Sequence, residues 1–371
     1  MNVSKSASLR RAEKYIQQLC CLGLDGQILI PALLEKLHDV IPSYGNAFFW
    51  TDANFKFRNL YDENPIFPQV ASVYASEFYN NREREIFNTF SESMRYDRGV
   101  QSLEEVLKTE KKAFFRHDFY HLIYRPLGYR HFIRIVLREN ELPLGRILLY
   151  RAEDRDFTAH ERRRLAAIAP FISHALSHPL ADNQIPLTDG RHEGLIITSP
   201  PGKIMFMSPQ AHKLLILATH LEISPTTLSD RKNAAVLPAA VAHLGQRLID
   251  IHRDTTYLGP PPVWRCRNAW GRFVFKAHWL NNVNPEPSTM IGITVQHQEP
   301  LPMRLLPKLE RLSLSYRQSQ LCLLMTSGLS YAAIAQRLNV GESTVIYHAR
   351  SVFLKLNVHN RNELVNKLLE M

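Results

Sequence analysis

Two imidazoles in the first third of the chain have the spacing of metal ligands. His117 and His121 are four residues apart, so they would share one face of a helix, and Arg116 and Asp118 lie beside them. No third ligand follows at a suitable spacing, and Pro126 comes soon after. We therefore predict that this cluster does not bind a metal ion and that the chain has no metal site.

The four cysteines do not form a recognisable framework. Cys20, Cys21, Cys266 and Cys322 are too few and too scattered for a set of disulfides, which fits a reducing compartment. Cys20 and Cys21 are adjacent at the end of a helical pattern. This placement favours two thiols near a core, with a redox switch as the alternative.

The sequence lacks the usual signatures of catalysis. It contains no nucleophile elbow, no glycine loop of the kind that binds phosphates, and no metal-spaced cluster. We therefore predict that the protein is not an enzyme and that it needs no cofactor. Signatures of cyclic-nucleotide or flavin binding are not visible either.

Composition and charge indicate a folded protein of several domains. The chain has 371 residues, of which 45% are hydrophobic and 22% are charged, more than one compact core usually holds. Its net charge of +10 is compatible with a nucleic-acid partner without proving one. The apolar runs are too short to cross a membrane, and no secretion signal is visible, so we expect a cytoplasmic protein that does not associate with membranes.

The C-terminal segment has the spacing of a helix-turn-helix. One helical pattern ends at Gly328, where a left-handed residue commonly closes a helix. Ser330 then caps a second helix over 331–338, and the turn 339–341 leads into a third helix over 342–356. Two helices joined by a short turn that contains Gly form this motif, in which the second helix lies in the major groove of DNA.

The same segment resembles the LuxR-type (GerE-like) DNA-binding domain over about 306–371, with many spacings in register and no gap. The resemblance implies a bacterial transcription regulator that binds double-stranded DNA, with RNA polymerase as a further candidate partner. The residues that carry it are Leu314-Ser315-Tyr316-Arg317, Gly328-Leu329-Ser330, Ile334-Ala335, Leu338, Val340, Thr344-Val345, His348, Lys355-Leu356, Val358 and Arg361.

The resemblance also implies which residues contact DNA. The third helix would read the duplex with its N-terminal and outward residues, which are Glu342, Ser343, Ile346, Tyr347, Ala349 and Arg350. Hydroxyl and guanidinium groups can reach phosphates or base edges. Thr344 would bind a phosphate or cap the helix, and His348 would contact a phosphate or serve a structural role. We expect Lys355 and Arg361 to touch the DNA backbone, with solvated surface charges as the alternative.

Three residues depart from the LuxR-type pattern. Gln318 stands where the family usually has Glu, so a neutral hydrogen bond would replace an internal ion pair with a basic residue of the domain. Gly341 replaces the common Ser cap of the reading helix, which is a modest loss. Ile346 replaces a common Lys that faces DNA, and it offers apolar surface to a thymine methyl group.

A last short helix, over 362–371, has Leu364, Val365, Leu368 and Leu369 on one side. In the family this helix pairs two DNA-binding domains. We therefore expect a homodimer that binds an inverted repeat with half-sites about one helical turn apart. The alternative is that this apolar face packs on its own domain.

The N-terminal region divides into two parts with different orders of elements. The first, over 1–184, has strands at 47–52, 55–61, 132–137 and 146–150 and a closing helix at 156–176. This order, with Gly145-Arg146-Ile147 and Phe157-Thr158-Ala159-His160-Glu161, resembles a GAF domain.

The second part, over 193–300, follows a predicted linker at 185–192. Its order of elements resembles a PAS domain, and 301–371 then form the helix-turn-helix domain. The predicted elements of this part are strands at 194–198 and 203–207, a helix from Ser208, a helix at 237–252, a hairpin of 264–268 with 272–280, and a strand at 290–296.

The predicted fold class is multidomain α+β, with GAF-like and PAS-like α/β sandwich domains followed by an all-α helix-turn-helix domain. Both N-terminal resemblances imply sensing of a small-molecule effector between a sheet and its helices, or dimerisation through flanking helices. The aromatic residues of the first part favour a hydrophobic core, with a pocket as the alternative; they are Phe48, Trp50, Phe57, Tyr120, Tyr124 and Phe132.

The function that this order predicts is a transcription factor whose sensor half controls how the two DNA-binding domains are spaced or exposed. Two alternatives remain. A phosphorylated response regulator would need a receiver domain with alternating strands and helices, which the N-terminal region lacks. An enzyme with a DNA-binding tail would need catalytic motifs.

The variant Ile346→Lys tests the predicted outward position of residue 346. A lysine there adds a contact to phosphate, so we expect tighter DNA binding and a salt dependence steeper by about 0.9 in log–log slope. The measurement is the DNA affinity of both proteins at several salt concentrations. Unchanged affinity and slope would show that residue 346 does not face DNA.

Overall fold

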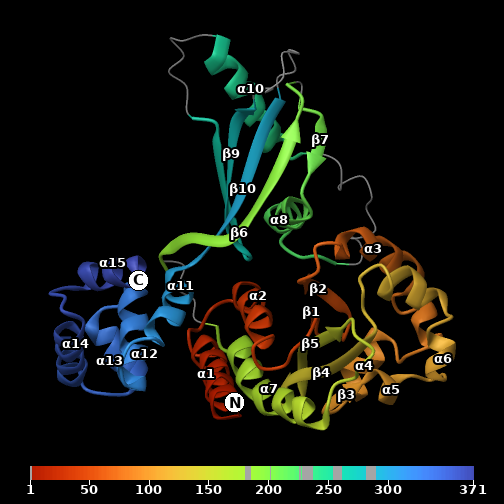
Figure 1. Cartoon of the computed structure of the whole chain (residues 1–371), viewed down its shortest axis with the longest axis horizontal. Coiled ribbons are helices and arrows are strands. Elements are labelled where there is room, and N and C mark those ends of the chain that lie inside the picture. Colours follow the sequence, from red (N-terminus) through yellow and green to blue (C-terminus); the bar gives the residue numbers. More distant parts are fainter. Residues whose placement is uncertain are drawn as a thin grey trace.

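The computed structural model describes residues 2–179, 185–200, 202–224, 227, 237–253, 261–280 and 290–371. They form two antiparallel sheets of five strands each, followed by an all-helical C-terminal domain (Figure 1). The predicted α+β multidomain fold class is confirmed. Within the described ranges, no helix has both the length and the apolar character needed to cross a membrane.

The first sheet has the strand order β2-β1-β5-β4-β3. Its strands are β1 (Gly45–Thr51), β2 (Phe57–Asp62), β3 (Val100–Ser102), β4 (His131–Glu139) and β5 (Leu142–Arg151). Both predicted hairpins are present, and the β4–β5 turn places Asn140 and Glu141 at positive φ. The sequence did not predict β3, because three residues between helices are too short for a visible alternation.

The two faces of this sheet pack against different helices, because successive strand residues point to opposite sides. Phe48, Ile147 and Leu149 belong to the core shared with α1 (Asn2–Cys20), α2 (Gly26–Leu37) and α7 (Ala159–Ser177). Their neighbours Phe49 and Leu148 belong to a second, separate core. Short helices cover that face: α3 (Phe67–Val73), η1 (Tyr74–Phe78), η2 (Arg82–Glu85), α4 (Phe90–Tyr96), α5 (Leu103–Val106), α6 (Lys111–Phe114) and η3 (Tyr120–Tyr124).

The second sheet has the order β7-β6-β10-β9-β8 and packs against α8 (Pro209–Thr219) and α10 (Ala239–Arg253). Ser208 caps α8 by accepting a hydrogen bond from the Ala211 N–H, as the sequence predicts. Gly194 lies so close to α8 that a Cβ would come within 2.4 Å of the Ala211 backbone. The strands are β6 (Leu187–Thr198), β7 (Ile204–Met207), β8 (Val263–Asn268), β9 (Gly271–Leu280) and β10 (Met290–Pro300).

The segment predicted as a linker, 185–192, is mostly strand. β6 begins at Leu187 and pairs with β10 as far as Pro300, with an irregularity between Gln296 and Gln298. The prediction failed because residues 187–193 are largely polar and include Asp189-Gly190, which reads as a turn. The extra residues of β6 and β10 form a two-stranded ribbon that leads directly into the C-terminal helices. Both sheets are antiparallel, so the described residues do not form the parallel sheet of a receiver domain.

The C-terminal domain consists of five helices, of which the first joins it to the rest of the chain. That helix, α11 (Leu301–Leu309), packs against α1, β6 and β10 on one side and against α12 and α15 on the other. The remaining helices are α12 (Tyr316–Thr326), α13 (Tyr331–Leu338), α14 (Glu342–Leu356) and α15 (Arg361–Glu370).

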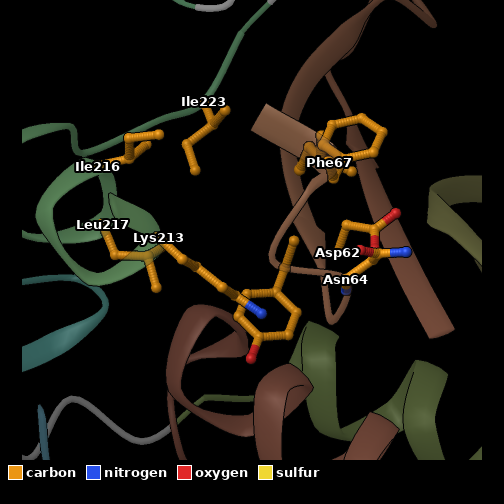
Figure 2. Close-up of a pocket in the computed structure, with 9 residues that line it drawn as sticks. Asp62, Asn64, Phe67, Lys213, Ile216, Leu217 and Ile223 are labelled. Carbon is orange, nitrogen blue, oxygen red and sulfur yellow. Dashed lines mark hydrogen bonds between the residues drawn. The ribbon is translucent and has the colours of Figure 1, made fainter. Parts of the chain in front are cut away.

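A buried lysine joins the first sheet to the second part of the chain. Lys213 of α8 donates from Nζ to the Glu63 carbonyl at 3.2 Å and lies 4.2 Å from the centre of the Tyr61 ring. Figure 2 shows its ammonium group beside that ring, with Asp62 and Asn64 beyond it. The Oδ1 atom of Asp62 accepts from the Asn64 N–H and from the Tyr129 hydroxyl.

The titration of this junction is strongly affected by burial. Desolvation raises the pKa of Asp62 to about 7 and lowers the pKa of Lys213 to about 8, because each loses hydration in its charged form. Further contacts fix the junction: the Ile223 N–H donates to Asn59 at 2.7 Å, and Arg58 pairs with Glu222.

The variant Asp62→Asn should remove one pH dependence of stability. The folded pKa of about 7 exceeds the ordinary 3.8, so the folded state binds this proton more tightly and wild-type stability falls as pH rises from about 4 to 7. Asn keeps the acceptor for Tyr129 but does not titrate. We expect the unfolding free energy of the variant, relative to wild type, to rise across this window in urea denaturation.

The exposed carboxylate Asp154 provides the control, since Asp154→Asn should produce no such trend. A difference between Asp62→Asn and wild type that stays constant from pH 4 to pH 8 would contradict the assigned pKa.

Candidate nucleic-acid interface

The helix-turn-helix begins and ends at the residues that the sequence predicts. Ser330 accepts from the Ala333 N–H at 3.2 Å and caps α13. Asn339 adopts a left-handed conformation, with φ of 50°, and closes that helix. Gly341 is the N-cap of α14 and supplies no side-chain bond, as its sequence implies. These caps fix the angle at which α14 leaves the turn.

One side of α14 is packed into the domain. Val345, Ala349 and Val352 are each at most 1% exposed, and they follow the i, i+4, i+7 spacing of a buried helical stripe. The sequence placed Ala349 among the outward residues, and this is wrong, because it lies one turn after Val345 on the inner stripe. Its small side chain belongs to the contact between helices.

The opposite side of α14 carries most of the predicted DNA-contacting residues. Tyr347 is 70% exposed, and Arg350 is exposed without an ion pair to any described carboxylate. Ile346 and His348 are half-buried, and the His348 ring contacts the Tyr347 ring edge-on at 5.5 Å. The remaining exposed residues of this helix are Glu342, Ser343, Thr344, Leu354 and Lys355.

Thr344 does not act as an internal cap within the described residues. Its hydroxyl makes no hydrogen bond there, and its own backbone N–H donates to the Gly341 carbonyl. The hydroxyl is therefore available at the N-terminus of α14, where backbone N–H groups and the helix dipole favour an anion. Its contact with phosphate stays a prediction.

Lys355 holds the domain together. Its Nζ donates to the Gln318 side-chain oxygen at 3.0 Å, and the Gln318 amide donates to Ser351 at 3.1 Å. Gln318 also accepts from the Ser315 N–H, which completes the cap of α12. The expected neutral replacement of an internal ion pair is thus confirmed. Whether Lys355 also touches DNA stays a prediction.

Arg361 likewise has an internal partner. Its guanidinium donates to the Leu329 carbonyl at 2.7 Å and lies 5.8 Å from the centre of the Tyr331 ring. It thereby ties the start of α15 to the turn that precedes α13. Its predicted contact with the DNA backbone is not tested by this arrangement.

The last helix uses part of its apolar face within its own domain. Leu364 and Leu368 are fully buried, and α15 packs against α11 and α12. Lys308 of α11 donates to the Leu369 carbonyl at 2.6 Å. Leu369 is 40% exposed, so the face is only partly covered by the described residues. This supports the alternative of internal packing for the two buried leucines.

The helix-turn-helix contacts the N-terminal helix through residues away from α14. Arg337 of α13 donates to the Leu22 carbonyl at 3.2 Å, and Lys14 lies 5.7 Å from the centre of the Tyr316 ring. In Figure 1, α14 lies at the outer edge of the domain, away from both sheets. The contact therefore leaves its exposed side open to a duplex.

The histidines considered as metal ligands have other partners. His117 contacts Glu85 at 3.0 Å, and Asp118 pairs with Arg82. A different trio, Glu139, His174 and His178, has ligand atoms within 4.8 Å of one another on the surface. The sequence did not reveal this trio, because the β4–β5 hairpin brings Glu139 to the end of α7 only in the folded chain.

The fold and the exposed face of α14 define a helix-turn-helix DNA-binding domain. Residues 312–368 match the family model described as bacterial regulatory proteins, luxR family, so this segment is a LuxR-type domain. No curated protein matches the chain significantly.

Three solved structures illustrate the similarity of the whole chain to known folds. A Vibrio cholerae VqmA–ligand–DNA complex is 11% identical and has a TM-score of 0.21, covering 49% of this chain and 84% of that one. A phage VqmA–DPO complex is 14% identical, with a TM-score of 0.18, 49% and 83% covered. The E. coli DhaR(N)–DhaL complex is 13% identical, with a TM-score of 0.25, 80% and 90% covered.

The variant Gln318→Glu should stabilise the domain. It places a carboxylate at the present position of the Gln318 oxygen, 3.0 Å from Lys355 Nζ, and Ser351 can donate to it in turn. We expect a gain of about 0.5–1.5 kcal/mol at pH 7 by chemical denaturation. Pairing lowers the folded pKa of the new carboxyl, so the gain disappears as pH falls below about 4.

Gln318→Leu provides the opposite comparison, since it leaves polar groups unpaired and should cost about 1–3 kcal/mol. Equal stability of Gln318→Glu and wild type at pH 7 would contradict the inferred role of Lys355.

Proposed function

We propose that this protein is a sequence-specific, dimeric transcription regulator whose N-terminal domains sense a small molecule or a partner. The observation that carries the proposal is α14: a reading helix in a LuxR-type domain, with Tyr347 and Arg350 exposed on its outer side. Over 312–368 the chain has six Lys and Arg against two Asp and Glu, so the domain is basic. A basic surface supports binding to phosphate and steering toward DNA.

DNA recognition divides among the residues of α14 by their chemistry. Ser343 and Thr344, at its N-terminus, are placed for phosphate contacts that fix the register of the helix. Arg350 can form two parallel hydrogen bonds with a guanine edge, and Ile346 can contact a thymine methyl group. Because Lys355 and Arg361 already have partners in the domain, we assign them to positioning the helix rather than to reading bases.

The N-terminal domains have the features of a sensor. We assign the first, with its sheet between two sets of helices, to a GAF-like type, and the second to a PAS-like type. A cavity on the α3 side of the first sheet supports ligand binding there. Phe67 and Leu60 with Asp62 relate this side to the junction around Lys213, since Tyr129 lines the cavity and donates to Asp62.

Control of DNA binding would pass through α11. The β6–β10 ribbon leads into this helix, and α11 also contacts α1 and the helices of the DNA-binding domain. A shift of the second sheet relative to α1 would therefore move α11 and with it the orientation of α14. Dimerisation would use the exposed remainder of α15, including Leu369, and would place two copies of α14 on an inverted repeat.

Selection of genomic DNA fragments by the full-length protein tests this function. We expect an enriched inverted repeat for wild type. The variant Arg350→Ala should lose about 1–3 kcal/mol of affinity for that sequence, a factor of about 5–150, with relaxed specificity at one base pair of each half-site.

Arg265→Ala is the matched control, because it removes an equally exposed positive charge from β8 of the second sheet. It should bind the selected sequence like wild type. Equal loss in both variants would mean that binding depends only on net charge, and a wild type that enriches no sequence, with or without added effectors, would contradict the proposal.

A further inference from the structure

A cavity lies between the first sheet and the short helices that cover its α3 side. Its volume is about 50 Å³, and aromatic rings form most of its wall. The aromatic residues are Phe49, Phe67, Tyr74, Phe87, Phe119, Tyr124, Tyr129, Phe132 and Tyr150. A wall of this kind suits an apolar body of few heavy atoms.

Two arginines of neighbouring strands also line this cavity, and one of them is fully paired. Arg134 of β4 forms an ion pair with Asp97 at 2.6 Å and donates to Gln101 at 3.2 Å. Asp97 is itself held by the Ser93 hydroxyl. The charge of Arg134 is thus balanced by a buried carboxylate, and its hydrogen bonds are largely used within the protein.

Arg146 of β5 differs from Arg134 in having no such partner. Its side chain is buried, with the residue 7% exposed, and it donates one hydrogen bond, to Ser93 at 3.1 Å. Its Nε has no hydrogen-bond partner among the described residues, and no carboxylate oxygen of those residues lies within 4.0 Å of its guanidinium. The rings of Phe49 and Phe90 lie 5.5 and 5.1 Å from it.

The other carboxylate in the cavity wall is already occupied. Glu83 accepts from the Asn80 and Phe90 N–H groups through one oxygen and from the Tyr74 hydroxyl through the other. Its charge acts on Arg146 only from a distance beyond an ion pair. Since a guanidinium stays protonated, its burial without a close anion carries a large free-energy cost.

We propose that this cavity binds a compact organic monocarboxylate, with its carboxylate on Arg146 and its apolar body among the aromatic rings. The inference rests on the proposed sensor function and names the chemical class of its effector. Arg146 offers the geometry that carboxylates prefer, because its planar guanidinium presents parallel N–H donors. The bound anion would supply the charge that the described residues around Arg146 do not place next to it.

Ligand binding to the full-length protein tests the proposal directly. The probes are sodium acetate, butanoate and benzoate, each compared with sodium chloride at equal ionic strength and with the neutral amides acetamide, butanamide and benzamide. We expect at least one carboxylate to bind by calorimetry and to raise the melting temperature, while its amide binds at least tenfold more weakly.

Two variants locate the site. Arg146→Gln should reduce affinity for the carboxylate at least tenfold, whereas Arg265→Gln, an exposed arginine of the second sheet, should leave it unchanged. Leu148→Phe keeps Arg146 but fills the cavity, and it should also reduce binding, so the proposal remains testable if Arg146→Gln folds poorly.

Binding of an amide as tightly as its carboxylate, binding that survives both variants, or no binding of any probe would overturn the inference. None of these results bears on the selection of DNA fragments, which uses a different surface. Failure of the ligand proposal and failure of the proposed DNA function are thus separate outcomes.

Discussion

The packing of α11 is the constraint on which the arrangement of the chain depends. Within nine residues, Leu301, Leu305 and Leu309 face the interior on successive turns, and this short helix contacts elements from the N-terminal helix to the last helix. As a result, one continuous core extends from α1, α2 and α7 through the second sheet to the DNA-binding domain. A helix buried on several sides cannot shift alone, so movement at either end is transmitted to the other.

The second core is separate from this one, and the separation has a physical consequence. Phe49 and Leu148 face the cavity side of the first sheet, while their neighbours Phe48 and Ile147 face the continuous core. A molecule bound among the aromatic residues would therefore act on the rest of the chain through the strands and through the Tyr129–Asp62 hydrogen bond at the junction with α8. This places a candidate signal on one side of a sheet and its readout on the other.

How far the sequence predicted the structure depended on whether the signal was local. Ser330, Gly328 and Asn339 fix helix ends by their own backbone preferences, and the helix-turn-helix was predicted residue by residue. The ribbon beginning at Leu187 was not predicted, because a polar strand is specified only by its partner in β10. Ala349 was placed on the wrong side of its helix because a small residue fits either environment.

The candidate sites show the same limit. The exposed side of α14 followed from its spacing, but the internal bonds of Lys355 and Arg361 depend on residues more than 30 positions away. The isolation of Arg146 could not be read from the sequence either, since Asp97 pairs with Arg134 only once β4 and β5 are assembled. Charge pairing in a core is decided by tertiary contacts, which no local pattern records.

The central claim, that the outer side of α14 reads DNA, is tested most directly by photo-crosslinking. A photoreactive amino acid would replace Tyr347, which is 70% exposed on α14, or the exposed Arg265 of β8 in a parallel preparation. After irradiation with bound duplex, the account predicts crosslinks from position 347 to bases in the major groove and none from position 265. Crosslinks from position 265 alone, or from position 347 to the sugar-phosphate backbone without sequence preference, would contradict it.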